Sequence, residues 1–142
     1  ISHINSKYRK NIIVFSKVYS LEKYNEIISS CDLVISTRVI GVVLSIMNKV
    51  PVVGIDYAQG KVKGFMKLAN IEQYCISWDT LDPDALKEKV DSAIKNNAYL
   101  IKKMNHIIPI LRKKAFLNTL LLLKWISESR RRAHADSGFS AV

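Results

Sequence analysis

The chain has 142 residues, of which 49% are hydrophobic and 24% are charged, and its formal net charge is +10 at pH 7. This composition is typical of a folded domain and excludes a disordered chain. The excess of Lys and Arg favours anionic partners such as phosphate-bearing ligands, nucleic acid or acidic lipid, but it identifies neither a fold nor a reaction.

The basic residues are scattered and lack the interleaved aromatic residues of a single-strand nucleic-acid platform, so we expect no nucleic-acid partner. Cys31 and Cys75 lie far apart without CxxC spacing. We therefore expect neither a metal site nor a disulfide, and we interpret both as core residues of a reduced, cytoplasmic domain. The opening residues show no signal peptide, and because the first residue is Ile we expect the chain to begin inside a longer protein.

Four short apolar runs are expected to form strands, at residues 12–15, 33–35, 52–55 and 74–77. Helical patterns separate these runs, and Ser20 is placed to cap the first helix. The run 33–35 has no polar alternation, so we expect a strand that is buried on both faces. Strands alternating with helices predict an α/β fold with a parallel sheet of about four strands, as in half of a doubly wound, Rossmann-like fold.

The second run is followed by Ser36, Thr37 and Arg38, and from there apolar residues recur at helical spacing. A helix is therefore expected to begin near Ser36 or Thr37, either of which can cap its free amides. Parallel α/β sheets bind anions where a strand ends at a helix N-terminus, because free amides and the positive end of the helix dipole converge there. Arg38 adds a full positive charge at this position.

The carboxyl ends of parallel strands meet along one edge of an open α/β sheet. This rule is expected to bring Arg38 and Lys61 near each other although they are far apart in the sequence. A cation at a helix N-terminus is unfavourable unless an anion or an acidic side chain answers it, which favours a binding role for Arg38. Ser36 and Thr37 are expected to act either as helix caps or as ligands of the anion.

The last third of the chain is predicted to be helical. Asp82 and Pro83 are expected to start a helix that ends near residue 97, and Pro109 is expected to kink or break the stretch that follows. We divide the chain into a Rossmann-like binding domain (1–97), a C-terminal helical extension (98–129) and a disordered basic tail (130–142).

Residues 115–126 are apolar nearly all round, but the segment is too short, and too interrupted by Lys124, to cross a bilayer. A helix that is apolar on all sides is usually buried, so we expect it to pack against another domain or against its own core. Peripheral contact with a membrane surface is the alternative, because Trp125, the leucines and the flanking cations suit one.

One set of motifs is shared with a known family: Ser36–Gly41, then Lys49–Val53, Tyr57, Lys61 and Gly64–Met66. In this order they resemble the C-terminal half of the polysaccharide pyruvyl transferases, over roughly residues 12 to 94. In that family a serine-rich turn ends a strand and an R-[LF]-H-[AG] motif opens the next helix. A G-x-P-V-V strand and a tyrosine-then-lysine loop follow.

The resemblance implies a two-domain transferase of the glycosyltransferase-B type. Such an enzyme moves a pyruvyl group, as a ketal, from phosphoenolpyruvate to a sugar of an exopolysaccharide or cell-wall glycan. The implied partners are phosphoenolpyruvate, a glycan acceptor and an N-terminal half outside this sequence, with no metal and no cofactor beyond the donor. The implied location is the cytoplasm, with the inner face of the membrane as a second expectation.

The resemblance also implies roles for single residues. Arg38 would hold the donor, Lys61 would be a second cation over it, and Tyr57, Ser36 and Thr37 would line the same site. Lys63 competes with Lys61, because the loop here has one residue more than the family spacing.

This chain has Ile40 where the family motif has its histidine, and isoleucine can neither contact the donor as an imidazole does nor transfer a proton. His3, His106 and His134 lie outside the strand-end loops and are interpreted as surface residues. A replacement acid would have to be Asp56, Tyr57 or a group outside this sequence. Two alternatives to an active pyruvyl transferase therefore stay open: a non-catalytic relic that acts as a binding or scaffold module, and a nucleotide-sugar glycosyltransferase of similar architecture.

Overall fold

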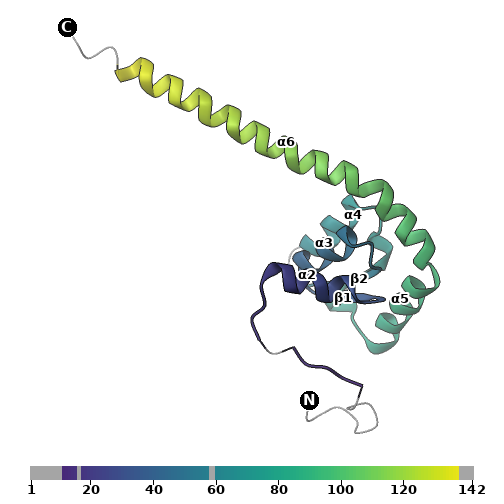
Figure 1. The fold of residues 1–142 in the computed structure, drawn as a ribbon. Coiled ribbons are helices and arrows are strands. Elements are labelled where there is room, and N and C mark those ends of the chain that lie inside the picture. The colour runs from purple at the N-terminus through teal and green to yellow at the C-terminus, as the bar shows by residue number, and fades with distance from the viewer. Residues whose placement is uncertain (1–10, 16, 58–59, 138–142) are drawn as a thin grey trace.

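The computed structural model describes residues 11–15, 17–57 and 60–137 of the chain. Strands and helices alternate along it, which confirms the expected α/β class (Figure 1). The elements in order are α2 (Leu21–Ser29), β1 (Val34–Ser36), α3 (Val39–Met47), β2 (Val52–Asp56), α4 (Lys61–Leu68), the 3₁₀ turn η1 (Glu72–Tyr74), β3 (Cys75–Ser77), the 3₁₀ turn η2 (Trp78–Thr80), α5 (Pro83–Lys95) and α6 (Asn97–Ser137).

The sheet is parallel, as expected, but in the described part of the chain it has three strands, in the order β1-β2-β3. Val34 pairs with Val52, and Gly54 pairs with Cys75. The strand expected at residues 12–15 does not form: this segment is exposed, with Ile13 at 81%, because no strand within the described residues pairs with it. The spatial order of the strands follows their order in the sequence, without the reversal that defines a doubly wound sheet. Double winding and a glycosyltransferase-B arrangement therefore stay predictions.

β1 is an edge strand, and the expectation that it is buried on both faces is wrong. Ile35 pairs with Val53 of β2, so the two side chains lie on the same face of the sheet. Val53 is fully buried, whereas Ile35 is 47% exposed. The helices therefore cover this face at the central strand but leave it open at the edge.

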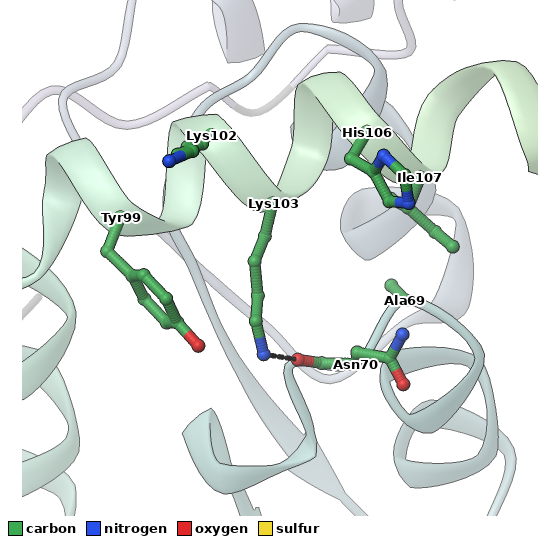
Figure 2. Close-up of a pocket in the computed structure, with 7 residues that line it drawn as sticks. All are labelled: Ala69, Asn70, Tyr99, Lys102, Lys103, His106 and Ile107. Atoms are coloured by element: carbon green, nitrogen blue, oxygen red, sulfur yellow. Dashed lines mark hydrogen bonds between the residues drawn. The ribbon is translucent and has the colours of Figure 1, made fainter.

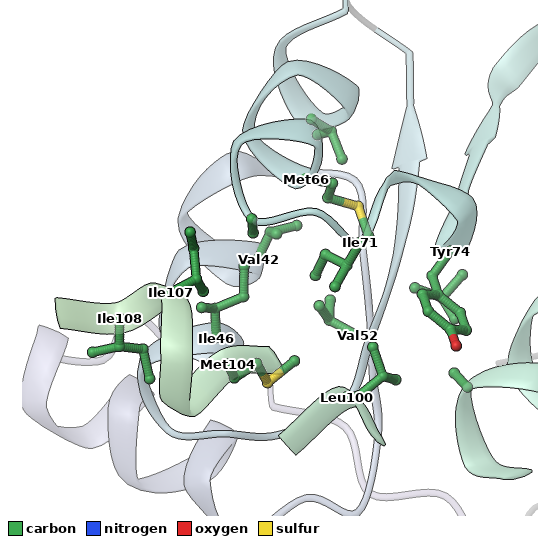
Figure 3. Close-up of a cluster of buried hydrophobic side chains, with 14 residues drawn as sticks. Val42, Ile46, Val52, Met66, Ile71, Tyr74, Leu100, Met104, Ile107 and Ile108 are labelled. Carbon is green, nitrogen blue, oxygen red and sulfur yellow. The ribbon is translucent and has the colours of Figure 1, made fainter. Parts of the chain in front are cut away.

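The core lies where α3, α4 and the first part of α6 meet the central strand β2 (Figure 3). Gly54 of β2 lets α4 approach closely, because a Cβ at this position would overlap the side chains of Met66 and Val62. Leu100 and Met104 of α6 are fully buried in the same core. The start of the expected helical extension therefore packs with the sheet, and the division into domains stays a prediction.

Two expected helix starts are confirmed. The Ser20 hydroxyl accepts a hydrogen bond from the Lys23 amide at the start of α2. Asp82 caps α5, with its Oδ1 accepting from the amides of Asp84 and Ala85 at 2.9 and 2.8 Å, and Pro83 is the first helical residue. These side chains satisfy amides that have no partner inside the helix.

α6 is longer and more continuous than expected. It runs through Pro109 without a break and bends over the body before extending away from it (Figure 1), as a helix that contains a proline can do. It also continues to Ser137, so residues 130–137 are helical where disorder is expected. Arg130, Arg131, Arg132 and Ala133 are good helix formers, and the three arginines are exposed, so the lack of hydrophobic periodicity there does not indicate disorder. Residues 138–142 lie outside the described part of the chain.

The apolar part of α6 does not pack against its own core. Leu121 is 64% exposed and Trp125 is 65% exposed, and the other large apolar side chains from Phe116 to Leu123 are exposed as well. Contact with another domain or with a membrane surface therefore stays a prediction. Within the described ranges, no helix combines the length and the apolar character needed to span a membrane.

Candidate functional site

A pocket of about 200 Å³ lies at the carboxyl ends of β1 and β2, between the first turns of α3 and α4. We call it the Arg38–Lys61 pocket. The carboxyl edge of a parallel sheet is where this class of fold binds ligands. The pocket is lined by Thr37, Arg38, Val39, Ile40, Asp56, Tyr57, Lys61 and Val62.

The turn that leads from β1 into α3 is fixed by Ser36. Its Oγ donates to the Arg38 carbonyl oxygen at 2.9 Å and accepts from the Arg38 amide at 3.2 Å. Arg38 itself is the residue that precedes the helix, and no side chain caps α3. The expectation that Ser36 or Thr37 caps this helix is therefore wrong. The Ser36 hydroxyl bonds the backbone of Arg38, the residue before the helix, and not an amide of its first turn. The first-turn amides of α3 carry the positive end of the helix dipole beside the pocket.

The N-terminus of α4, on the opposite wall, holds a carboxylate of the chain itself. Oδ1 of Asp56 accepts a hydrogen bond from the Val62 amide at 3.1 Å. Gly60 precedes α4 with φ +76°, a left-handed conformation that favours glycine. The carboxylate of Asp56 therefore already lies at the N-terminus of α4. The N-terminus of α3 has no such side chain, so its amides can bind the anionic group of a ligand.

The charges of the pocket favour an anionic ligand. Arg38 and Lys61 contribute two cations, and Asp56 is the single acidic residue among the described residues that line it. The ion pairs found in the described part of the chain are Lys23–Glu26, Lys87–Asp91 and Lys124–Glu128, so neither cation of the pocket is paired there. An anion at this place would meet two positive charges and a helix N-terminus.

The structure places the sequence-predicted site residues as follows. Thr37, Arg38, Tyr57 and Lys61 line the one pocket, so the expected proximity of Arg38 and Lys61 is confirmed. Ser36 is not among its lining residues, and its hydroxyl is engaged with the Arg38 backbone. Whether any of these residues binds a donor stays a prediction.

Ile40 lies in the pocket wall, with its side chain 48% exposed. The position at which the resemblance expects a histidine is therefore open to a ligand in this chain, but it is apolar. Lys63, which competes with Lys61 in the sequence, is not a lining residue. Within residues 11–15, 17–57 and 60–137, no three His, Cys, Asp or Glu side chains come together as a candidate metal site.

A second pocket, which sequence reasoning missed, lies between the end of α4 and the first part of α6 (Figure 2). The sequence contains one signal for it: Tyr99, Lys102, Lys103, His106 and Ile107 recur at the spacing of one helix face. His106 is exposed, as expected, but it also lines this pocket. The facing wall comes from residues about thirty positions earlier in the chain, which only the fold brings near.

One comparison with protein families covers the Arg38 side of this pocket. The family model of polysaccharide pyruvyl transferases matches residues 1–59. The match confirms the resemblance over β1, α3 and β2, and it includes Arg38, Ile40 and Tyr57. It ends before Lys61, so the resemblance beyond residue 59 stays a prediction. No curated protein and no solved structure matches the chain.

Proposed function

We propose that this chain is the donor-binding part of a polysaccharide pyruvyl transferase and that it binds phosphoenolpyruvate in the Arg38–Lys61 pocket. The observation that carries the proposal is that Arg38, which precedes α3, and Lys61, the first residue of α4, line one pocket beside the uncapped N-terminus of α3. The family match over residues 1–59 supports the reaction class.

Phosphoenolpyruvate suits this pocket because it carries a phosphate and a carboxylate on a three-carbon body. The guanidinium of Arg38 can hold either group through two parallel hydrogen bonds, and the first amides of α3 can add to the same anion. Lys61, on the opposite wall, can neutralise the second group as a point charge. Asp56 keeps the α4 amide at Val62 engaged, so the donor would be drawn toward α3.

Pyruvyl transfer as a ketal has a simple proton balance. Two hydroxyls of the acceptor sugar bond to C2 of phosphoenolpyruvate, one of their protons goes to its methylene carbon to make a methyl group, and the other leaves with phosphate. The step therefore needs a group that moves a proton to carbon. Ile40 cannot do this, which leaves Asp56, Tyr57 or a group outside this sequence, and Asp56 already uses one oxygen to bond the Val62 amide.

The exposed Ile40 side chain favours a second candidate function, a non-catalytic module that keeps the ligand pocket. The variant Ile40→His separates the two. If the natural protein lacks pyruvyl transfer and Ile40→His gains it, the chain is a relic. If the natural protein already transfers pyruvate to a glycan acceptor, the relic is discarded.

A nucleotide-sugar glycosyltransferase is supported less well. Its diphosphate would fit the N-terminus of α3, but no acidic residue is obviously placed to read a ribose: Asp79, the acidic residue that follows β3, lies in η2 and does not line the pocket. A competition experiment distinguishes the two donors. If the natural donor is a nucleotide sugar, it should displace phosphoenolpyruvate from the pocket, because both would bind at the N-terminus of α3.

The proposal is tested by amide hydrogen exchange on the full-length protein with and without phosphoenolpyruvate. Slower exchange is expected at the start of α3 and in the segment from Asp56 to Val62, and not in α5. Equal exchange in both samples at saturating donor would overturn the proposal. The variant Arg38→Ala should lose the protection at both segments, whereas Lys63→Gln, whose side chain does not line the pocket, should keep it.

A further inference from the structure

The pocket between α4 and α6 is a separate site with a chemistry of its own. It has a volume of about 290 Å³ and lies beside Ala69 and Asn70, which follow the last residue of α4. Lys61 is the first residue of that helix, so the two pockets lie at opposite ends of α4, about 12 Å apart at 1.5 Å per residue. The second pocket therefore does not share residues with the Arg38–Lys61 pocket.

One wall is a basic face of α6. Lys102, Lys103 and His106 lie on this face, and no Asp or Glu is among the described residues that line the pocket. None of the three takes part in an ion pair within the described residues. A ligand here would meet basic groups with no acidic side chain beside them in the wall.

The ammonium group of Lys103 is held in place across the pocket. Its Nζ donates to the carbonyl oxygen of Asn70 at 2.7 Å and lies 5.0 Å from the centre of the Tyr99 ring (Figure 2). An ammonium group has three donors, and this contact uses one of them. Lys103 therefore fastens α6 to the end of α4 and still has donors to offer to a bound anion.

Asn70 lines the pocket on the side opposite α6, and its backbone is in the left-handed conformation. Its φ is +56°, and the turn is closed by hydrogen bonds from the Asn70 amide to Lys67 and from the Ile71 amide to Met66, at 3.0 and 2.9 Å. This left-handed turn directs the Asn70 carbonyl to Lys103. Asn70 and His106 both line the pocket, Asn70 from the turn after α4 and His106 from α6 (Figure 2).

The remaining lining is apolar. Ala69 and Ile107 are buried, and the ring of Tyr99 is 50% exposed at the other end of the wall. A small inorganic anion would leave this apolar surface uncovered, and an uncharged apolar molecule would leave the basic groups without a partner. A ligand that satisfies both carries an anionic group on an apolar or aromatic body.

We propose that the pocket between α4 and α6 binds a small organic anion, a phosphate monoester or carboxylate joined to an apolar or aromatic group. The anionic group lies between Lys103 and His106, with Lys102 at the rim. The apolar body packs against Tyr99, Ala69 and Ile107. The site is independent of phosphoenolpyruvate, which has no apolar body to cover these residues.

The test uses the full chain, nitrogen-15 labelled, titrated with phenyl phosphate and, in parallel, with benzoate, inorganic phosphate and phenol. Saturable shifts are expected at the amides of Asn70, Tyr99 and His106 with phenyl phosphate, with benzoate, or with both. Inorganic phosphate and phenol are each expected to bind at least about tenfold more weakly, because each meets only half of the site. The two aromatic anions distinguish a phosphate-binding site from a carboxylate-binding one.

The variant Lys102→Gln/His106→Gln is expected to weaken phenyl phosphate or benzoate binding about tenfold or more, since it removes two charge-assisted contacts and leaves the Lys103 clamp. Lys113→Gln/Lys114→Gln, on the same helix but outside the pocket, is the matched control and should bind as the natural chain does. The proposal is overturned if no ligand gives saturable shifts at the pocket, or if the control loses as much affinity as the pocket variant. A melting temperature equal to that of the natural chain shows that the pocket variant is folded, and Tyr99→Ala is an independent second variant with the same expectation.

Discussion

The hydroxyl group of Ser36 lies in the space that a side chain at position 41 would need. A Cβ built on Gly41 would overlap Ser36 Oγ and lie 3.1 Å from Ser36 Cβ. The same hydroxyl bonds both the amide and the carbonyl of Arg38. Gly41 therefore allows Ser36 to fix the backbone of the residue on which the proposed donor site depends.

The variant Gly41→Ala is expected to lose about 1–3 kcal/mol of unfolding free energy, the usual cost of overpacking a close contact. It should also weaken phosphoenolpyruvate binding, because the Ser36 hydroxyl can no longer hold the Arg38 turn. Urea unfolding and a donor titration measure the two effects. In a double-mutant cycle, Ser36→Gly should recover part of the stability lost by Gly41→Ala but not the donor affinity. Additive losses in stability would contradict this account.

Lys49 follows the end of α3 with a left-handed backbone, φ +61°, although it is not a glycine. Its amide bonds the Ile46 carbonyl, and the next amide, of Val50, bonds the Ser45 carbonyl at 2.9 Å. The variant Lys49→Gly is expected to stabilise the protein by about 0.5–1 kcal/mol, because relief of the left-handed strain exceeds the added freedom of the unfolded chain. Lys49→Ala keeps the strain and should give no such gain in the same unfolding experiment. Equal unfolding free energies of the two variants would show that the left-handed backbone at Lys49 costs no stability.

The surroundings of Cys75 disfavour the charged form of its thiol. Partial burial, and secondly the nearby carboxylate of Asp56, raise the pKa of its thiol above the ordinary value of 9.0. The folded state then holds this proton more tightly than the unfolded state, so the thiol's contribution to stability is complete below pH 9 and is lost as the pH rises through the folded pKa. Unfolding free energy measured from pH 8 to 10.5 should fall more steeply for the natural chain than for Cys75→Ser. Thiol alkylation in a Cys31→Ser background should give an apparent pKa above 9.0, and a value at or below it would contradict the burial.

The exposed part of α6 should contribute little to folding. Its apolar side chains from Phe116 to Trp125 are exposed, whereas Met104 on the same helix is fully buried. Removal of residues 116–142 is expected to change the unfolding free energy by less than about 0.5 kcal/mol, as for other surface changes. Met104→Ala, the matched change in the buried part, should cost about 2–5 kcal/mol. A large loss on truncation would mean that this segment packs on the body in solution.

The sequence predicted the elements whose signals are local. Ser20 and Asp82 could be recognised as caps because the hydrogen-bonding side chain and the amides it satisfies lie within three residues of each other. The proximity of Arg38 and Lys61 followed from one topological rule for parallel sheets. Neither prediction needed any knowledge of how the helices pack.

The features that were missed depend on contacts between distant segments. The sequence predicts a strand at Ile13 and a strand buried on both faces at Ile35, but an apolar run does not tell whether a neighbouring strand or a covering helix exists. The contact between Lys103 and Asn70 joins residues thirty-three positions apart, so the second pocket has no complete signature in either segment. The sequence also leaves Asp56 as a candidate proton donor. It gives no sign that one oxygen of this carboxylate bonds the Val62 amide, because that bond forms only in the folded loop.

The central claim is that the Arg38–Lys61 pocket holds phosphoenolpyruvate, and isothermal calorimetry on the full-length protein tests it most directly. We expect saturable binding of the donor by the natural chain and by Lys63→Gln, and loss of binding in Arg38→Ala, because the guanidinium supplies the two-bond contact to the anion. Absence of donor binding by the natural full-length protein, or equal affinity in Arg38→Ala, would contradict the account.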